Sequence, residues 1–267
     1  IGHYSEHDIK EAARAFTGWE LRKDEFRFNR YQHDDGMKSL LGKSGRFNGD
    51  DILKILLEQP ATARFLVRKL YHFLVSETAE APDALIEPLA AGFRAAQYDM
   101  TWLLRTMLGS NFFYSPHAVR QRVKSPIEFA IGFLHALEGS ANTYALADDL
   151  RDLGQAVFFP PNVKGWDGGA AWINSSTLVG RANLVWNLLS DRDGRYHTRL
   201  ALDRLPALSG INDPAAISRR VADLLLAAPL PDAVYVQLAA VAADNASPNR
   251  LARVVQAVAT LPEFQLA

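Results

Sequence analysis

From residue 48 almost to the end of the chain, apolar side chains recur at the spacing of one face of an α-helix. Several of these runs begin at helix-start signals. Asp50 or Asn48 can cap the first run, Pro60 suits the first position of a longer run that reaches Val75, and Ser125 precedes a proline at a later start. We therefore expect a mainly α fold, an irregular multi-helix domain. In the run from Pro60, the side chains expected to face the core are Phe65, Leu66, Leu70 and Phe73.

Residues 19–42 lack the helical spacing of apolar residues. They follow a short helix that Ser5 is expected to cap. Phe26-Arg27-Phe28 alternates apolar and polar side chains, and Lys23-Asp24 ahead of it suits a turn. Ser39-Leu40-Leu41 fits a third short strand. The pattern predicts one short β-hairpin, or a three-strand insertion, near residues 19–42.

A long segment rich in proline, glycine and tryptophan interrupts the helical pattern at residues 157–175. Loops of this length are uncommon inside compact helical domains, and such loops are often functional. The expected organisation is a main helical domain with the small β insertion over residues 1–190. A linker or irregular segment over 191–210 leads to a small helical bundle over 211–267, packed on the main domain.

Composition excludes several classes of site and partner. The chain has no cysteine, which removes disulfides, thiolate metal ligands and cysteine nucleophiles. Its formal net charge is -1, from 29 Lys and Arg against 30 Asp and Glu. General nucleic-acid binders usually carry a basic excess or stripe, so no nucleic-acid partner is expected. No run approaches the ~20 apolar residues that span a bilayer, so no membrane span is expected in this chain.

The first segment that could carry chemistry is His33-Asp34-Asp35. Imidazole and carboxylate groups are good ligands for zinc or manganese, and a His-Asp pair can transfer protons. Adjacent residues rarely ligate one metal together, so such a site needs partners from elsewhere, and the sequence names no particular metal or cofactor. The alternative is a polar turn, because Asp34-Asp35-Gly36 supplies typical turn residues.

The second segment is the loop at 157–175, which holds Trp166 and Trp172 close to Asn162 and Asn174. Tryptophan rings offer flat area for sugars or apolar ligands, and asparagine side chains offer directed hydrogen bonds, so these four residues form a candidate ligand platform. The alternative is a loop of the Ω type, in which the tryptophans plug the core of the domain.

The third segment places Arg120, Arg122 and Lys124 immediately before the helix expected at Ser125. Free backbone N–H groups and the helix dipole favour anions at such a position, so Arg122 and Lys124 are candidate anion-binding residues. The alternative is an ordinary basic turn, solvated or paired with Glu128 and nearby carboxylates.

Short sequence motifs, in a fixed order over nearly the whole chain, resemble those of a known protein family. The motifs are Tyr4-Ser5-Glu6, Ala12–Trp19, His33–Gly36 with Leu41-Gly42, Pro60–Phe65 with Lys69-Leu70, Val123–Phe129, Pro160–Val163 with Gly165-Trp166, Trp172–Ser175 and Pro262–Gln265. Together they resemble a bacterial family of uncharacterised proteins, the domain of unknown function 1800.

The resemblance implies a longer parent protein with a further helical region ahead of Tyr4, so this chain would be its C-terminal portion. It also implies export to the periplasm or the cell exterior. The expected partners are the missing N-terminal part of the parent chain and a cell-envelope glycan or protein. The resemblance further implies that the protein is encoded beside a second uncharacterised family, whose members resemble phosphatases or sulfatases, and that it works with a partner. The family offers no catalytic residue to carry over.

Three functions remain open at this point, and whether the protein is an enzyme is undecided. The first is a non-catalytic glycan- or protein-binding or assembly module of the cell envelope. The second is a metal-assisted or acid/base hydrolase acting on an anionic or carbohydrate substrate, with His33, Asp34 and Asp35 as ligands or base. The third is a purely structural helical scaffold. A shared site requires the polar turn and the tryptophan loop to converge on one face.

Overall fold

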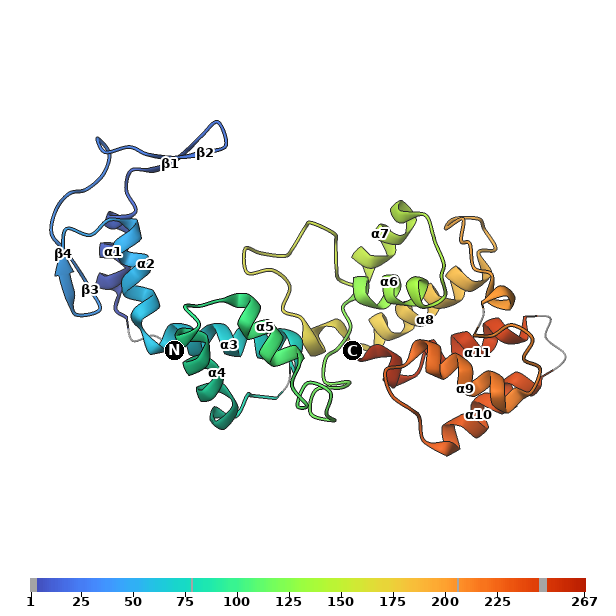
Figure 1. Ribbon diagram of the computed structural model, residues 1–267. Helices are drawn as coiled ribbons and strands as arrows, with labels where there is room; N and C mark the ends of the chain where they lie inside the picture. Colours follow the sequence, from blue (N-terminus) through green and yellow to red (C-terminus); the bar gives the residue numbers. More distant parts are fainter. Residues whose placement is uncertain (1–3, 78, 206, 245–248) are drawn as a thin grey trace. The chain divides into compact units, whose positions relative to one another are not determined.

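The computed structural model describes residues 4–77, 79–205, 207–244 and 249–267, and these residues are mainly helical (Figure 1). The predicted mainly α fold is therefore confirmed. The helices are α1 (Glu6–Ala15), α2 (Gly49–Glu58), α3 (Pro60–Leu74), α4 (Asp83–Ala95), α5 (Met100–Leu108), α6 (Pro126–Ala136), α7 (Thr143–Asp152), α8 (Ser175–Ser190), α9 (Pro214–Leu225), α10 (Asp232–Ala243) and α11 (Arg250–Ala259). Short 3-10 turns cover Gly169–Trp172, Leu202–Arg204 and Pro262–Gln265.

The chain divides into two compact units. The first unit is Ile1–Leu70 with Ala81–Thr106, and the second unit is Tyr71–Glu80 with Met107–Ala267. The sequence-based division at 191–210 stays a prediction. Within the second unit, one cluster of buried side chains includes residues from both sides of that segment.

Helix starts follow the capping signals in the sequence. Ser5, Asn48 and Ser125 each accept a hydrogen bond from the backbone N–H three residues on, and an acidic side chain at that position bonds back to the cap. This reciprocal capping box satisfies N–H groups that a helix otherwise leaves unpaired at its first turn. The predicted starts of α1, α2 and α6 are thereby confirmed.

The predicted β insertion is confirmed in the first unit. Strands β1 (Trp19–Arg22) and β2 (Glu25–Phe28) form an antiparallel hairpin. Its turn residues Lys23 and Asp24 have φ of 52° and 62°, the left-handed values that a tight two-residue hairpin turn needs. A second hairpin pairs β3 (Lys38–Leu40) with β4 (Lys43–Gly45), so the expected third strand has its own partner. Strand β4 was not predicted from the sequence.

Helix α3 presents a different face to the interior from the one expected. Ala63, Val67 and Tyr71 are buried, whereas Phe65 and Phe73 are 56% and 65% exposed. The buried residues are spaced by four, which keeps them on one side of the helix, and the two phenylalanines lie off that line. Cations cover the exposed rings in part, because Lys69 lies over Phe65 and Arg122 lies over Phe73. The inward assignment of Phe65 and Phe73 was wrong.

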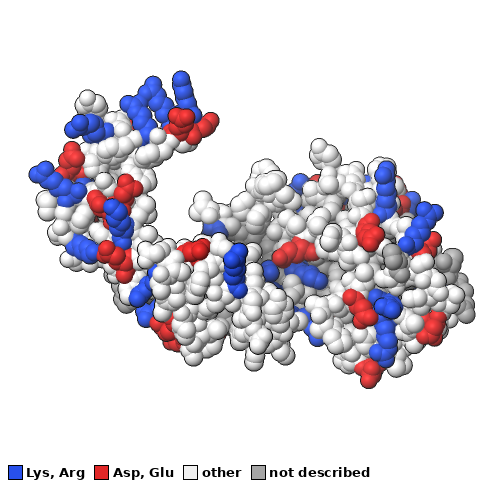
Figure 2. Space-filling model, viewed as in Figure 1, with Lys and Arg blue, Asp and Glu red and all other residues white. Residues whose placement is uncertain are grey.

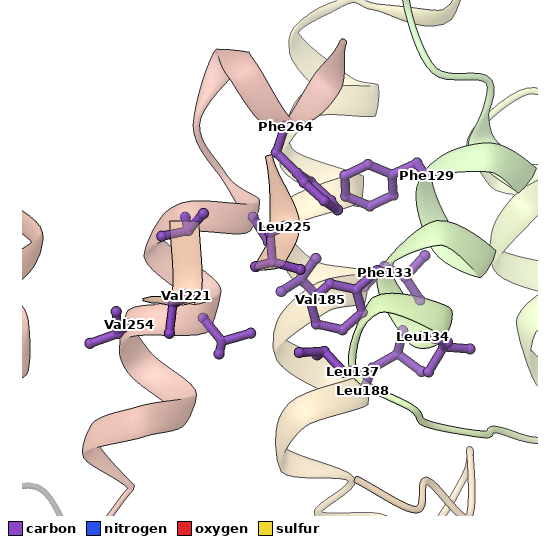
Figure 3. Close-up of a cluster of buried hydrophobic side chains, with 14 of the residues drawn as sticks. Phe129, Phe133, Leu134, Leu137, Val185, Leu188, Val221, Leu225, Val254 and Phe264 are labelled. Atoms are coloured by element: carbon purple, nitrogen blue, oxygen red, sulfur yellow. The ribbon is translucent and has the colours of Figure 1, made fainter. Parts of the chain in front are cut away.

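The core of the second unit forms where α6, α8, α9 and α11 meet (Figure 3). Phe129 and Phe133 project from α6 toward Phe264, and their ring centroids lie 5.3 Å and 6.3 Å from that of Phe264. Val185 on α8 and Val221 on α9 are fully buried in the same cluster. The 3-10 turn Pro262–Gln265 thus places an aromatic ring among these helices. One of them, α6, precedes the turn by more than a hundred residues.

Charged side chains of both signs lie on the surface, and several of them form local ion pairs. Figure 2 shows cations and carboxylates interspersed over the visible face, without an extended area of one sign. Arg64 and Glu87, for example, form a two-pronged ion pair between α3 and α4. Within the part of the chain that the structure describes, none of the helices is long and apolar enough to cross a bilayer.

Replacing Phe264 by alanine tests the importance of this core. The side chain is 2% exposed, and its removal leaves a cavity between Phe129 and Phe133. We expect the free energy of unfolding to fall by about 3–5 kcal/mol, as is typical of a buried phenylalanine. Urea denaturation followed by circular dichroism measures the change. Tyr144→Ala is the control, because Tyr144 is 85% exposed and its loss should cost less than ~0.5 kcal/mol. Equal losses in both variants would contradict this assignment.

Candidate functional site

The loop between α7 and α8 adopts a defined path in the second unit. Gly168 and Gly169 have φ of 77° and 53°, which a side chain would disfavour, and they lead into the 3-10 turn that ends at Trp172. The hydroxyl of Thr177 donates to the carbonyl of Trp172 over 3.0 Å and so ties this turn to the start of α8. The long loop predicted at 157–175 is confirmed as a structured connection.

This loop and the adjoining helix ends surround a pocket of about 380 Å³, named here the loop pocket. Trp166 is half-buried and Trp172 is 8% exposed, and both line it. Two of the four predicted platform residues, the tryptophans, are therefore brought together with a third, Asn174. The polar and aromatic lining comes from Asp152, Trp166, Asp167, Trp172, Asn174, Ser176 and Thr177.

The two predicted asparagines have local structural duties. Asn174 caps α8, since its side-chain oxygen accepts from the backbone N–H of Thr177 over 2.9 Å. Asn162 accepts from the backbone N–H of Lys164 over 2.8 Å, which stabilises a tight turn in the loop. Asn162 is not among the residues that line the loop pocket. Asn174 therefore both shapes the pocket and fixes the helix behind it.

Sequence reasoning missed the two carboxylates of the pocket. Asp152 is the last residue of α7, and Asp167 follows Trp166 in the loop. The carboxylate of Asp167 also forms an ion pair of 3.1 Å with the ammonium group of Lys164. The position of Asp167 beside a candidate tryptophan was an available signal, whereas nothing local in the sequence singles out Asp152.

The basic segment before α6 is engaged by protein groups. Arg122 donates to Glu128 over 3.0 Å, and Lys124 donates through its ammonium group to the carbonyl of Phe264 over 3.0 Å. At the helix N-terminus, Ser125 accepts from Glu128 N–H and the Gln155 side chain accepts from Ile127 N–H. Pairing with Glu128 is thus the arrangement present, and anion binding by Arg122 and Lys124 stays a prediction without a free helix terminus to support it.

Arg181 is a buried cation that sequence reasoning missed. It lies on α8, is 1% exposed, and donates to the carbonyl of Lys124 over 2.8 Å and to the Gln265 side chain over 3.2 Å. Its guanidinium group also lies 5.0 Å from the ring centre of Phe129. Burial lowers the pKa of Arg181 to about 10. Arg181 therefore fastens residue 265 to the segment before α6, where Val123 and Leu266 form an antiparallel bridge.

The polar turn His33-Asp34-Asp35 lies in the first unit and is fixed to α1. Arg14 donates two hydrogen bonds to the Asp34 carboxylate, of 2.8 Å and 3.1 Å, and these bonds lower the pKa of Asp34 to about 2. The Nδ1 atom of His33 lies 2.9 Å from the carbonyl oxygen of Thr17. Asp35 is exposed, with its carboxylate 3.9 Å from His33 Nε2.

The buried ammonium group of Lys38 reinforces this turn by donating to the carbonyls of Asp34 and Gly36. Among the residues that the structure describes, no group of three or more His, Asp or Glu side chains is placed to hold a metal ion. These contacts fit the polar-turn alternative, and a catalytic or metal-binding role for His33 and its neighbours stays a prediction. So does the convergence of this turn with the tryptophan loop, because the two segments belong to different units.

The burial of Lys124 predicts a pH dependence of stability. Burial lowers the pKa of Lys124 to about 8, so the folded protein binds fewer protons than the unfolded chain between that pH and the ordinary lysine pKa of 10.5. The free energy of unfolding of the wild type, relative to Lys124→Met, should therefore rise as the pH increases through this interval. Urea denaturation of both proteins at several pH values measures it. Lys164→Met, which removes an exposed lysine, is the matched control and should show no such trend. A flat difference for Lys124→Met would refute the prediction.

Comparison with known proteins identifies one match. A family model described as a protein of unknown function, DUF1800, matches residues 1–266 of the 267-residue chain. No curated protein and no solved structure matches the chain. The chain therefore belongs to the DUF1800 family of proteins of unknown function.

Proposed function

We propose that the loop pocket binds a neutral sugar unit of a glycan, and that the protein is a non-catalytic glycan-binding module of the cell envelope. The observation that carries the proposal is the lining of the pocket. Trp166 and Trp172 share it with the carboxylates of Asp152 and Asp167. The envelope location, periplasmic or outside the cell, rests on the family resemblance.

The lining matches the chemistry of a sugar ring. A pyranose has an apolar face of C–H groups and a rim of hydroxyls, which the flat area of Trp166 and the polar side chains of the pocket can contact separately. Ionised carboxylates accept hydrogen bonds only, and the hydroxyl of Ser176 can both donate and accept. The volume of about 380 Å³ lies within the range of about 300–1,000 Å³ typical of small-molecule sites.

The charge of the pocket favours a neutral ligand. Asp152 and Asp167 both contribute to its lining, and Lys164 pairs with only one of them, Asp167. A carboxylate or phosphate on the ligand would therefore meet a negative charge, and such like-charge contacts are unfavourable. Neutral hexoses and N-acetylated hexosamines avoid this repulsion.

The pocket is also held in shape before any ligand arrives. Asn174 caps α8, Thr177 bonds to the carbonyl of Trp172, and Trp172 itself is buried. A pre-formed site loses little conformational entropy on binding, which matters for sugars because their contacts are individually weak. Both hypotheses for the tryptophan loop then apply, each to a different residue. Trp172 fills the interior of the domain, and Trp166 contacts the ligand.

Replacing Trp166 by alanine tests the proposal. Isothermal titration calorimetry with short neutral oligosaccharides, one series of glucose and one of N-acetylglucosamine, should detect binding to the wild type. Trp166→Ala should weaken it about tenfold or more, because an aromatic contact contributes about 1.5 kcal/mol. An oligosaccharide of uronic acids is the anionic comparison and should bind more weakly than the neutral series.

Trp186→Ala is the matched control. Trp186 is half-buried like Trp166 and belongs to the same unit, but it lies on α8 beside Arg192 and does not line the loop pocket. Its removal should leave the affinity unchanged. Absence of binding by every neutral oligosaccharide, or equal affinity of Trp166→Ala and the wild type, would overturn the proposed function.

A further inference from the structure

The β1–β2 hairpin of the first unit has one apolar and one charged face. Trp19 pairs with Phe28 and Leu21 pairs with Phe26, and side chains at paired positions point to the same side of a sheet. The intervening pairs, Glu20 with Arg27 and Arg22 with Glu25, place opposite charges across from one another on the other side. The hairpin is therefore amphipathic over its whole length.

Its apolar face is largely open. Leu21, Phe26 and Phe28 are 75%, 65% and 46% exposed, although Phe26 packs edge-on against Trp19. An isolated two-stranded hairpin is marginally stable in water, and a third or fourth strand with a shared apolar face adds much to its stability. The hairpin thus has a physical reason to gain further strands.

The outer edge of β2 is the edge on which a strand can be added. In an antiparallel pair, the N–H and C=O groups of alternate residues point inward and outward. Asn29 N–H donates to the Gly18 carbonyl over 2.7 Å, so residues 29 and 18 form a hydrogen-bonded pair. Since hydrogen-bonded and non-hydrogen-bonded pairs alternate, the backbone N–H and C=O groups of Phe26 and Phe28 point outward. On the outer edge of β1, by contrast, Trp19 N–H already donates to the Phe16 carbonyl over 3.2 Å. Among the residues that the structure describes, β1 and β2 form a two-stranded sheet, and no other strand lies beside β2 (Figure 1).

The charges along β2 are complementary to themselves. Its sequence is Glu25-Phe26-Arg27-Phe28, with Glu25 and Arg27 exposed on either side of Phe26. An antiparallel copy of this strand, related by a two-fold axis at Phe26, places Glu25 opposite Arg27 of the second copy and Arg27 opposite Glu25 of the second copy. Opposite charges directly across from each other stabilise strand pairing, and like charges destabilise it.

We propose that two copies of this chain associate through the outer edge of β2, antiparallel about an axis at Phe26, to form a four-stranded sheet. The outward N–H and C=O groups of Phe26 pair with those of the second copy, and the two Phe26 rings meet at the axis. A second copy is favoured over another partner because the strand supplies its own charge complement, as a symmetric interface requires. Exposed edges otherwise invite unspecific pairing, and the alternating charges restrict this edge to one register.

Two charge variants test the interface without placing like charges opposite each other inside the hairpin. Arg22→Glu/Glu25→Arg leaves β2 with two cations and keeps an opposite-charge pair at positions 22 and 25. Glu20→Gln/Arg27→Glu leaves β2 with two carboxylates, and the glutamine amide oxygen preserves the acceptor that Glu20 offers to Asn29 over 2.6 Å. Each variant places like charges across its own two-fold axis, whereas a mixture of the two restores opposite charges.

Sedimentation velocity over about a hundredfold range of concentration provides the measurement. The wild type should self-associate, each variant alone should do so at least about tenfold more weakly, and an equimolar mixture should recover the association. Recovery in the mixture also shows that both variants are folded. Arg64→Glu/Glu87→Arg, which reverses an ion pair between α3 and α4 of the same unit, is the matched control and should associate like the wild type. A wild type that stays monomeric throughout, or charge variants that self-associate as the wild type does, would overturn the proposal.

Discussion

The second unit depends on the burial of Arg181 and Phe264 at one junction. Arg181 donates to the backbone of Lys124 and to the side chain of Gln265, so a single guanidinium group joins α8, the segment before α6 and residue 265. Removing a cation from water is costly, and these bonds and the face of Phe129 offset that cost only if the geometry is kept. The packing of Phe264 against α6 keeps it. Apolar packing and the polar contact therefore support each other.

This junction also determines where the loop pocket lies. Helix α8 carries Arg181 and Val185 in the core and Asn174 at its cap, so the position of its first turn follows from the core packing. The loop must join that turn to the end of α7 at Asp152. The pocket thus forms between two helix ends that the interior has already positioned, and the loop contributes its tryptophans to a stable frame.

The polar groups of the first unit serve a different purpose. Arg14 and Lys38 hold the turn at Asp34 by its carboxylate and its carbonyls, which attaches the β insertion to α1. These charged side chains connect small elements that lack a large core. These contacts do not cover the β1–β2 hairpin. Its apolar face therefore stays exposed, and the outer edge of β2 stays open to a further strand.

Elements whose causes are local can be predicted from the amino-acid sequence. The caps at Ser5, Asn48 and Ser125 and the turn at Lys23-Asp24 depend on atoms within about four residues, so a short window contains the whole interaction. Local sequence also pointed to Trp166 and Trp172, because both lie in a segment rich in proline and glycine. Helix packing, in contrast, determined which groups meet over long separations: Asp152 with the tryptophans, and Arg181 with Gln265, 84 residues apart. It also decided which face of α3 is buried. Burial and pocket lining depend on how helices pack, and no periodicity within one helix specifies its neighbours.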